Sequence, residues 1–493
     1  MPANSVVFIL NAHLPFVRHP EYPRFLEEDW LFESISESYL PLLRMFNKLK
    51  ADKVPFKFTI SLSPTLCCML TDPVLQERFV QYEERLIELG EKEVERCGNE
   101  QPEFLEMAQF YLAQAKQNLS DYQDLYRTNI LDGFKALETS GHLELVTTAA
   151  THAYLPLYTE YPTAINAQIE LGVQSFLTTF GHLPKGFWLP ECGYYPALEE
   201  NLKYHGISWF QTASQSMLLS PDKVQYGNYR PVRCPNGVAA FPRDFQGTSL
   251  VWSNTSGYPT DKAYREFYRD IGYDLPMEYI KPYIHEPSVR VFTGYKYWAI
   301  TGHTDQKVPY QRSEAQKRVV EHAHNFIYNL KKKGRQLSSA MGVAPLFTLA
   351  YDAELFGHWW FEGIEWLDQV IRLAAKESEE ISLVTPSLFL SKEGTSLQTA
   401  RPAFSSWGQG GYSAVWLDGS NAWTYRHIHK AIERMEELAV RFNDQISLKQ
   451  RFLNQAAREV LLAMASDWPF VLFNKSSTAY AEKRVRDHLR NFN

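Results

Sequence analysis

Two acidic residues in this chain occupy positions that are typical of catalytic carboxylates. Glu191 follows a short apolar run at 186–189 and a proline, and Asp352 follows a second apolar run at 346–350. Short apolar runs bounded by polar residues predict buried strands. Both carboxylates would therefore lie at strand ends, where they can transfer a proton or attack an electrophilic carbon. We predict that Glu191 and Asp352 form a catalytic pair.

The segment around Glu191 has a functional and a structural interpretation. In residues 188–194 (WLPECGY) the acid lies between aromatic rings, and Trp188 is a candidate substrate contact. Alternatively, Glu191 would stabilise the first turn of a helix that begins near Pro196, because an acid there interacts favourably with the helix dipole. This segment by itself leaves both interpretations open.

The segment after Asp352 concentrates polar groups that are costly to bury unpaired. Residues 351–363 read YDAELFGHWWFEG. On an extended backbone, Asp352 and Glu354 would face the same side. We predict Glu354, His358 and Trp360 as substrate contacts, and a purely structural role for the cluster is the alternative.

Two carboxyl groups on either side of a glycosidic bond can cleave it. When they are about 5 Å apart, one attacks the anomeric carbon and the configuration is retained, whereas a wider spacing lets water attack. The chain is also rich in aromatic residues, at 14%, with 12 Trp and 28 Tyr. Flat rings with hydrogen-bonding edges suit sugar faces, although they also fill cores.

Alternating strand and helix patterns must position these residues. Apolar runs predict strands at 5–10, 56–62, 143–149, 186–189, 291–293 and 346–350, and amphipathic patterns predict helices at 31–49, 166–180 and 313–331. Such alternation implies an α/β fold with a parallel sheet. His13 and His152, like the two carboxylates, lie just after predicted strands, where barrels of βα units carry their chemistry.

Two regions depart from a plain barrel. Residues 73–138 read as long amphipathic helices and predict an inserted helical subdomain, and the tail predicts helices at 421–443, 448–465 and 478–489. We therefore predict a catalytic barrel at 1–400 and a C-terminal helical domain at 401–493. The proline-rich loop at 214–237 is a candidate lid.

Composition excludes several classes of partner. A net charge of -7 without a long basic run argues against nucleic acid or an anionic membrane, and no apolar run reaches the roughly 18 residues of a membrane helix. The sequence predicts no cofactor and no metal site, and it leaves the oligomeric state open. The five cysteines lack paired spacing, which favours free thiols and a cytoplasmic protein: Cys67, Cys68, Cys97, Cys192 and Cys234.

Ordered segments along almost the whole chain resemble motifs of glycoside hydrolase family 57. They begin at Asn11 (NAHLPF), Trp188 (WLPECGY), Tyr351 (YDAELFGHWWFEG) and Trp407 (WGQGGYSAVWL). Within that family, residues 257–272 (GYPTDKAYREFYRDIG) and 466–470 (SDWPF) make the chain most similar to the 1,4-α-glucan branching enzymes. The first motif carries Leu where many members carry Gln, which is compatible with that group.

The resemblance implies a (β/α)7 barrel, an inserted helical domain, a C-terminal helical domain that closes the cleft, and an α-glucan substrate. It also implies a retaining double displacement in which Glu191 attacks the anomeric carbon and Asp352 protonates the leaving oxygen. Asp352 would then deprotonate the 6-hydroxyl of an acceptor chain, or water. The other implied sugar contacts are His13, His152, Arg243, Gly257, Trp407 and Asp467; for a strand-end histidine, a packing role is the alternative.

The loop at 214–237 and the Gly-rich stretch at 407–417 would influence what accepts the glucan. The resemblance implies a mobile loop whose tip tyrosine covers the site, and Tyr226 or Tyr229 is the candidate. The loop is short, so water would compete better with an acceptor sugar, and we expect some hydrolysis beside branching. Trp407 and Trp416 would stack on glucose units as exposed rings, or else anchor the tail in the core.

Three alternatives stay open from the sequence. An α-amylase or 4-α-glucanotransferase would use the same scaffold and carboxylates with a different acceptor. A metal-dependent deacetylase also places His and Asp at strand ends, but the expected set of adjacent Asp and spaced His is missing. A non-catalytic glycan-binding protein would have little reason to keep both carboxylates.

Overall fold

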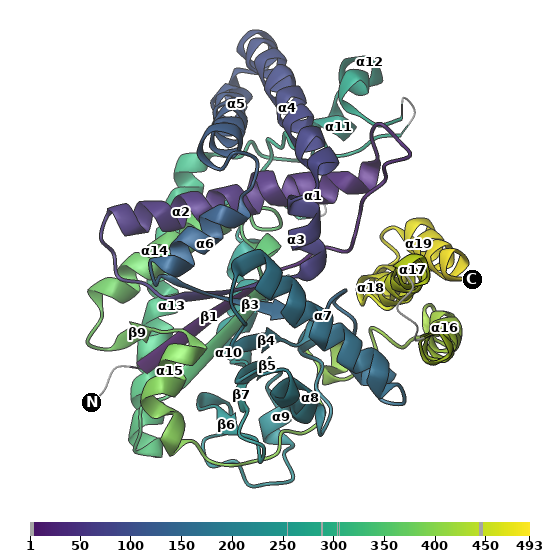
Figure 1. The fold of residues 1–493 in the computed structure, drawn as a ribbon. Coiled ribbons are helices and arrows are strands. Elements are labelled where there is room, and N and C mark those ends of the chain that lie inside the picture. Colours follow the sequence, from purple (N-terminus) through teal and green to yellow (C-terminus); the bar gives the residue numbers. More distant parts are fainter. Residues whose placement is uncertain (1–3, 254, 287–288, 303, 305, 443–446) are drawn as a thin grey trace.

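A ring of short strands forms the centre of the molecule (Figure 1), in a computed structural model that describes residues 4–253, 255–286, 289–302, 304, 306–442 and 447–493. The strands are β1 (Asn4–Ala12), β2 (Phe58–Leu62), β3 (Leu143–Thr148), β4 (Gly186–Trp188), β5 (Trp209–Thr212), β6 (Val232–Arg233), β7 (Ala239–Pro242), β8 (Leu346–Asp352) and β9 (Ile381–Leu383). Their order is β6-β7-β5-β4-β3-β2-β1-β8, and β9 pairs with the start of β1. Every pair is parallel except β6 with β7.

The ring closes between β7 and β8. A parallel bridge joins Arg243, directly after β7, to Thr348 in β8, and the Asp244 amide donates to the Thr348 carbonyl at 2.8 Å. Within the described ranges, the seven parallel strands β1, β2, β3, β4, β5, β7 and β8 thus form a closed (β/α)7 barrel. The predicted fold class is confirmed. Bulky residues of alternate strands, such as Ile9 and Trp188, fill its interior.

Helices cover the outside of this barrel. They are α1 (Asp29–Glu33), α2 (Leu40–Ala51), α3 (Pro64–Leu70), α6 (Leu131–Thr139), α7 (Pro162–Phe180), α8 (Leu198–Tyr204), α9 (Gln215–Leu218), α10 (Phe245–Trp252), α13 (Arg312–Met341), α14 (Gly363–Lys376) and α15 (Pro386–Glu393). The short helices α11 (Ile271–Asp274) and α12 (Met277–Ile280) lie away from the barrel in Figure 1, where the Tyr279 hydroxyl of α12 donates to Glu93 at 2.8 Å. In the described part of the chain, no helix combines the length and the apolar character needed to cross a membrane.

The region predicted as an insertion contains two long helices, α4 (Pro73–Glu100) and α5 (Leu105–Ser120), followed by α6. The carboxylate of Asp72 accepts from the amides of Val74 and Leu75, which caps the start of α4. Figure 1 shows α4 and α5 packed together and projecting beyond the barrel. Whether they form a domain of their own stays a prediction.

The tail is helical, as predicted, with α16 (Ala422–Arg441), α17 (Ser447–Ala463), α18 (Asp467–Asn474) and α19 (Thr478–Phe492) grouped beside the barrel in Figure 1. The sequence reasoning missed α18 because Pro469 reads as a helix breaker. Proline is tolerated in the first turn of a helix, where its missing N–H has no intrahelical partner to lose. The segment at 443–446, where the first predicted tail helix was to end, lies outside the described residues.

One predicted strand is wrong. Residues 291–293 are not a strand, although Val291 and Thr293 are β-branched and Phe292 is aromatic. The amides of Thr293 and Gly294 instead donate to the buried carboxylate of Asp270, at 2.9 and 3.0 Å. A side chain thus replaces the neighbouring strand as the hydrogen-bonding partner of this backbone.

Two strands of the barrel, β5 and β7, were not predicted. Each has only four residues, and β7 consists of two alanines, a phenylalanine and a proline, which are weak indicators of a strand. Both are fully buried and pair with each other in register from Trp209 with Ala239 to Thr212 with Pro242. Their strand conformation comes from the position between neighbours and not from local propensity.

Candidate active site

The carboxyl ends of the barrel strands bring most of the predicted site residues together. Parallel strands of a barrel end at one face, and β1, β3, β4, β7 and β8 are followed there by polar residues. Asn11 near the end of β1 links two of these strands, because its Nδ2 lies 3.4 Å from Asp352 Oδ1 and 3.4 Å from His152 Nε2. Two segments from beyond the barrel, at 405–416 and 465–467, complete the site.

Glu191 is held by one hydrogen bond on each carboxylate oxygen. The Ser466 hydroxyl donates to Oε1 at 2.8 Å, and Trp407 Nε1–H donates to Oε2 at 2.8 Å. The Trp407 amide also donates to the Glu191 carbonyl oxygen at 3.0 Å. Two such donors stabilise the ionised carboxylate and fix its orientation. A carboxylate that acts as a nucleophile must be both ionised and correctly oriented.

The backbone at Glu191 is strained. Glu191 has φ 60° and ψ 22° and Cys192 has φ 50°, so two consecutive residues other than glycine adopt left-handed conformations. His152, at the end of β3, also has a positive φ of 54°. Such conformations are unfavourable and persist where the surrounding structure imposes them, often at functional sites. Here the tight turn after β4 directs the carboxylate of Glu191 toward the segments that carry Trp407 and Ser466.

Asp352 has weaker hydrogen bonding than Glu191. Its side chain receives only the long contact from Asn11, at 3.4 Å. Burial raises the pKa of Asp352 to about 6, against the opposing effects of Asn11, His13 and Arg243. A carboxyl group with few donors and a raised pKa keeps a proton more readily, as a general acid must.

The two carboxylates titrate as a pair. Burial raises the pKa of Glu191 to about 7 despite its two donors, and the charge of Asp352 adds to the increase. Because the charge of Asp352 disfavours ionisation of Glu191, the pair holds about one proton between about pH 6 and pH 7. The two pKa values alone would leave that proton on Glu191, whereas the two donors on Glu191 act in the opposite direction and favour its ionised form.

Two stacked histidines flank the pair. The rings of His13 and His152 lie 3.8 Å apart with an angle of 13° between their planes. Burial by itself lowers the pKa of His13. The Asp467 carboxylate, 3.1 Å from His13 Nε2, outweighs this effect and raises that pKa above its usual value. Burial, and then the charge of His13, hold the pKa of His152 well below its usual value. The surroundings thus favour the protonated form of His13 and the neutral form of His152.

A neutral His152 with its proton on Nδ1 satisfies its contacts. Nδ1–H would donate to the Ser466 hydroxyl at 3.1 Å, and Nε2 would accept from Asn11 at 3.4 Å. Ser466 in turn donates to Glu191. The ring therefore orients the serine that holds the nucleophile, in addition to any contact with substrate.

Glu354 is buried behind this pair. It lies in a 3-10 turn, Ala353–Leu355, and not on an extended backbone, so the basis for predicting that it faces the same side as Asp352 was wrong. Its Oε1 accepts from the Tyr39 hydroxyl and from the His13 amide, the latter at 3.2 Å. Burial, followed by the charge of Asp352, raises the pKa of Glu354 to about 8. In this structure Glu354 supports His13.

An aromatic wall stands beside Glu191. The Trp407 ring stacks on Trp252 with centroids 5.9 Å apart, and the buried Arg243 guanidinium lies 5.1 Å from the centre of the Trp407 ring. Trp188 is fully buried and contacts Trp407 edge-on at 5.4 Å. Trp188 therefore supports the wall, and the expectation that it touches substrate is corrected. Trp252, which is 45% exposed, was missed.

Two further tryptophans predicted as substrate contacts are core residues. Trp416 is 1% exposed and stacks on Tyr154, with centroids 4.6 Å apart. Trp360 is 2% exposed and packs among Trp366 and other rings of the main core. The prediction of an exposed ring that stacks on glucose is wrong for Trp416, and the burial of Trp360 gives no support to its prediction as a substrate contact. For Trp416 the structure agrees with the alternative, in which the ring anchors the tail.

His358 and Gly257 also have structural roles in this molecule. His358 Nδ1 lies 2.6 Å from Glu37 Oε2, and the two half-buried side chains form a pair that shares no hydrogen bond with Glu191 or Asp352. Gly257 packs so closely that a Cβ would lie 2.5 Å from the Ser253 carbonyl oxygen. The expectation that these two residues contact substrate finds no support in their surroundings.

The tyrosines of the predicted lid do not face the carboxylates. Residues 214–237 contain α9, a 3-10 turn at Gly227–Tyr229, and β6. The Tyr229 ring packs on Phe347 at 6.0 Å, near the start of β8, whereas Asp352 lies at the end of that strand. Tyr226 lies in the same turn, where its carbonyl accepts from the Tyr229 amide. In this structure neither Tyr226 nor Tyr229 covers the carboxylates, as a lid tyrosine would.

Besides Trp252, three residues with positions of interest were missed: Asn11, Ser466 and Trp359. The first two belong to segments singled out in the sequence, but nothing in the sequence marks them as partners of His152 and Glu191. Trp359 is 54% exposed, stacks on Phe267 at 4.5 Å, and its amide donates to the Glu354 carbonyl oxygen. The sequence does not tell which of the adjacent residues Trp359 and Trp360 is exposed, because this depends on the fold.

Comparisons with known proteins agree with this site. The sequence profile of Glycosyl hydrolase family 57 matches residues 7–337, and that of the 1,4-alpha-glucan branching enzyme C-terminal region matches 427–493. This chain belongs to glycoside hydrolase family 57. Its two matched regions together contain Glu191, Ser466 and Asp467, and Trp407 and Asp352 lie between them.

The similar proteins carry two different activity names. A 1,4-alpha-glucan branching enzyme of Thermococcus kodakarensis is 33% identical over 519 residues, which cover 99% of this chain and 72% of that protein. Among solved structures, the alpha-amylase AmyC of Thermotoga maritima is 43% identical with a TM-score of 0.92, covering 100% of this chain and 92% of AmyC. The GH57-type branching enzyme of Pyrococcus horikoshii is 34% identical with a TM-score of 0.88, and the match covers 98% of this chain and 88% of that enzyme.

We expect a bell-shaped pH dependence of kcat/KM, with its maximum between about 6 and 7, because of the pKa values of Asp352 and Glu191. Below this range both carboxyls hold a proton and the nucleophile is lost; above it both are ionised and no acid is left. Initial rates on amylose from about pH 4 to about pH 9 measure this profile. A rate that stays constant across the range would contradict the shared proton.

The Trp407→Phe substitution keeps an aromatic ring but removes the N–H that donates to Glu191. Losing one charge-assisted hydrogen bond of about 1.5 to 3 kcal/mol should lower kcat/KM about 10- to 150-fold. Because that donor lowers the pKa of Glu191, the acidic limb of the pH profile should move to higher pH. A lower rate with an unmoved limb would mean that the ring only packs.

Proposed function

We propose that this protein is a retaining α-glucan transglycosylase that cleaves α-1,4 bonds and re-forms them as α-1,6 branches. The main support for this chemistry is the carboxylate pair. Glu191 accepts two hydrogen bonds of 2.8 Å, whereas among the described residues Asp352 accepts one of 3.4 Å. Branching is supported by the branching-enzyme C-terminal profile at 427–493 and by relatives named as branching enzymes.

In the first step, Glu191 attacks the anomeric carbon of an α-1,4-linked glucose unit while Asp352 gives its proton to the leaving glycosidic oxygen. The chain with the new non-reducing end departs, and the donor glucan stays bound to Glu191 as an ester. His13, whose protonated form Asp467 favours, would offset negative charge in the site when it is protonated, and Arg243 contacts the face of the Trp407 ring.

In the second step, ionised Asp352 accepts the proton of an acceptor 6-hydroxyl, whose oxygen attacks the anomeric carbon and displaces Glu191. Two inversions restore the α configuration and create a branch. The exposed rings Trp252 and Trp359 are suited to hold sugar units near the site. Water in place of the 6-hydroxyl gives hydrolysis.

An α-amylase is the second candidate, because AmyC is 43% identical and bears that name. Tyr226 and Tyr229 also do not cover the site here, so the ester on Glu191 would be open to water. We therefore propose that branching is accompanied by hydrolysis. The free thiols of all five cysteines are consistent with action in the cytoplasm on a storage glucan.

The deciding experiment is incubation of the full chain with amylose, followed by counting of new α-1,6 linkages by proton NMR and of released reducing ends. Branch points in excess of reducing ends support the transferase. Reducing ends without branch points would make the protein an amylase, and linear products of new lengths from maltooligosaccharides would make it a 4-α-glucanotransferase.

A further inference from the structure

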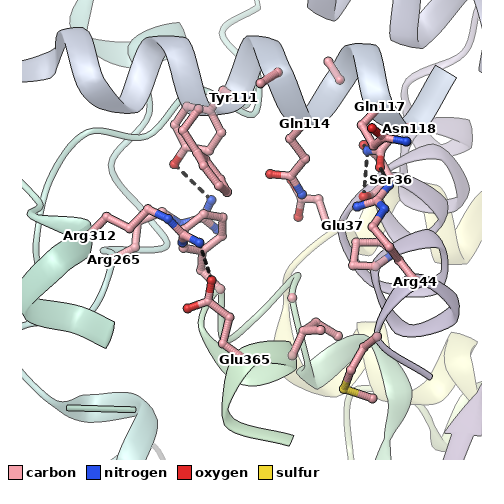
Figure 2. Close-up of a pocket in the computed structure, with 18 of the residues that line it drawn as sticks. Ser36, Glu37, Arg44, Tyr111, Gln114, Gln117, Asn118, Arg265, Arg312 and Glu365 are labelled. Atoms are coloured by element: carbon pink, nitrogen blue, oxygen red, sulfur yellow. Dashed lines mark hydrogen bonds and ion pairs between the residues drawn. The ribbon is translucent and has the colours of Figure 1, made fainter. Parts of the chain in front are cut away.

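A cavity of about 770 Å³ lies outside the barrel, between α5 on one side and α2, α13 and α14 on the other (Figure 2). Its lining includes none of the side chains that hydrogen-bond to Glu191 or Asp352. The volume falls within the range of ligand pockets, about 300 to 1,000 Å³. The candidate active site does not account for it.

The sequence of α5 explains why this space is not filled. The face that α5 turns to the cavity carries Phe110 and Tyr111 near its start, but beyond them only small or polar residues, where a packed helix would carry large apolar ones: Ala113, Gln114, Ala115, Gln117 and Asn118. The other side of α5 packs along α4. The inserted helices are thus held against each other and stand away from α13 and α14.

Unpaired hydrogen-bonding groups face the cavity. Figure 2 shows Gln114 extending from α5 into the space between the group at Arg265, Arg312 and Glu365 and the group at Arg44 and Asn118. Within the described ranges, the side-chain amides of Gln114, Gln316 and Gln369 form no hydrogen bond with the protein. Each amide offers both donors and an acceptor.

Two buried polar atoms of the lining also lack a protein partner. Arg265 is 6% exposed, and its Nε is unpaired; Oδ1 of Asp368 is buried and unpaired as well. Leaving buried polar atoms without partners costs free energy. Both atoms are closed to water, so the unpaired groups that a ligand can reach are the side-chain amides of the three glutamines.

The rings of the cavity carry cations on their faces. Arg312 lies 4.2 Å from the centre of the Phe110 ring, and Arg265 lies 4.1 Å from that of Phe361. The ring edges and the aliphatic parts of these side chains supply apolar surface beside planar polar groups. This combination is typical of sites that bind sugars, whose rings have apolar faces and polar edges.

The charges of the cavity favour a neutral ligand. Arg312 is paired with Glu365, and Arg44 lies 2.7 Å from Asp121. An anion would have to compete with these carboxylates for the guanidinium groups. A neutral polyhydroxyl chain can use the remaining donors and acceptors without breaking either ion pair.

We propose that this cavity is a second, non-catalytic α-glucan-binding site, which holds one part of a chain while another part occupies the site at Glu191. The proposal rests on the proposed function, because it takes the same substrate class as its ligand. A long glucan bound at the cavity is concentrated near the carboxylates. The second site should therefore lower the KM for long glucans and leave the KM for short oligosaccharides unchanged.

The test fills the cavity with the Gln114→Trp substitution. The matched control is Gln109→Trp, which makes the same change at an exposed position of α5 outside the cavity. We expect Gln114→Trp to raise KM for amylose about tenfold, equivalent to about 1.4 kcal/mol, with kcat and the KM for maltoheptaose unchanged. The control should match the parent protein, and equal melting temperatures would show that neither variant is misfolded.

Calorimetry with maltoheptaose, in a Glu191→Gln background that prevents turnover, provides the second measurement. We expect two binding events in that background and one after Gln114→Trp is added. A single event from the outset, or two events that survive the substitution, would overturn the inference while leaving the proposed function intact. No binding of maltoheptaose at all, together with no turnover of amylose by the parent protein, would overturn both.

Discussion

The Glu191→Gln variant should lose activity on amylose by about 10⁴-fold or more, equivalent to about 5.5 kcal/mol of barrier. An amide is almost the same size as the carboxylate and still contacts Ser466 and Trp407, but it cannot form the ester intermediate. Initial rates on amylose measure the loss. Near-normal turnover would remove Glu191 from its proposed role.

A chemical rescue separates the nucleophile from a residue that only supports the fold. In a Glu191→Ala variant with an α-glucosyl fluoride donor, azide can occupy the vacated space and attack the anomeric carbon in a single displacement. The expected product is a β-glucosyl azide, because one inversion replaces two. The control Glu433→Gln changes an exposed carboxylate of α16 and should leave the rate unchanged. Rescue with an α product would contradict the assignment.

The Asp352→Asn variant should lower turnover of amylose about 10²- to 10⁴-fold, the usual contribution of general acid-base catalysis. The asparagine cannot give a proton to the leaving sugar oxygen or remove one from the acceptor. The alkaline limb of the pH profile should also disappear, because the group that must stay protonated is gone. A rate within a few-fold of the parent would exclude Asp352 as the acid/base.

The leaving group distinguishes this role from a purely structural one. Fluoride departs without protonation, so the Asp352→Asn variant should still form the ester on Glu191 from an α-maltosyl fluoride, and slow breakdown should let it accumulate. Intact-protein mass measurement should then detect the added maltosyl group. Asp487→Asn, on the surface of α19, is the matched control and should show normal turnover with no accumulation. An absent adduct together with lost activity would mean that Asp352 mainly maintains the site.

The histidines illustrate what sequence reasoning can and cannot resolve. His13 and His152 were placed at strand ends from the apolar runs before them, and the structure brings them within stacking distance. The different charge states that the surroundings favour for these rings could not be predicted, because these depend on Asp467, which is 454 residues away from His13 in the chain. A pKa is set by burial and by neighbouring charges, and neither is local in sequence.

The tryptophans make the same point about exposure. Trp407 and Trp416 lie in one Gly-rich stretch and had the same two interpretations, yet one donates to Glu191 and the other is buried on Tyr154. Trp359 and Trp360 are adjacent, and only Trp359 is exposed. Composition predicts that aromatic residues gather around such a site, but packing decides which of them a substrate can reach.

The two carboxylates could be proposed, and the barrel that carries them predicted, from the sequence alone. Apolar runs of strand length followed by polar residues specify strand ends, and parallel strands bring those ends to one face. Only the tertiary structure decided how the carboxylates differ. Ser466 and Trp407 reach Glu191 from 275 and 216 residues away, while Asp352 receives one long contact. The roles of nucleophile and acid follow from these donors, because hydrogen bonds to a carboxylate favour its ionised form.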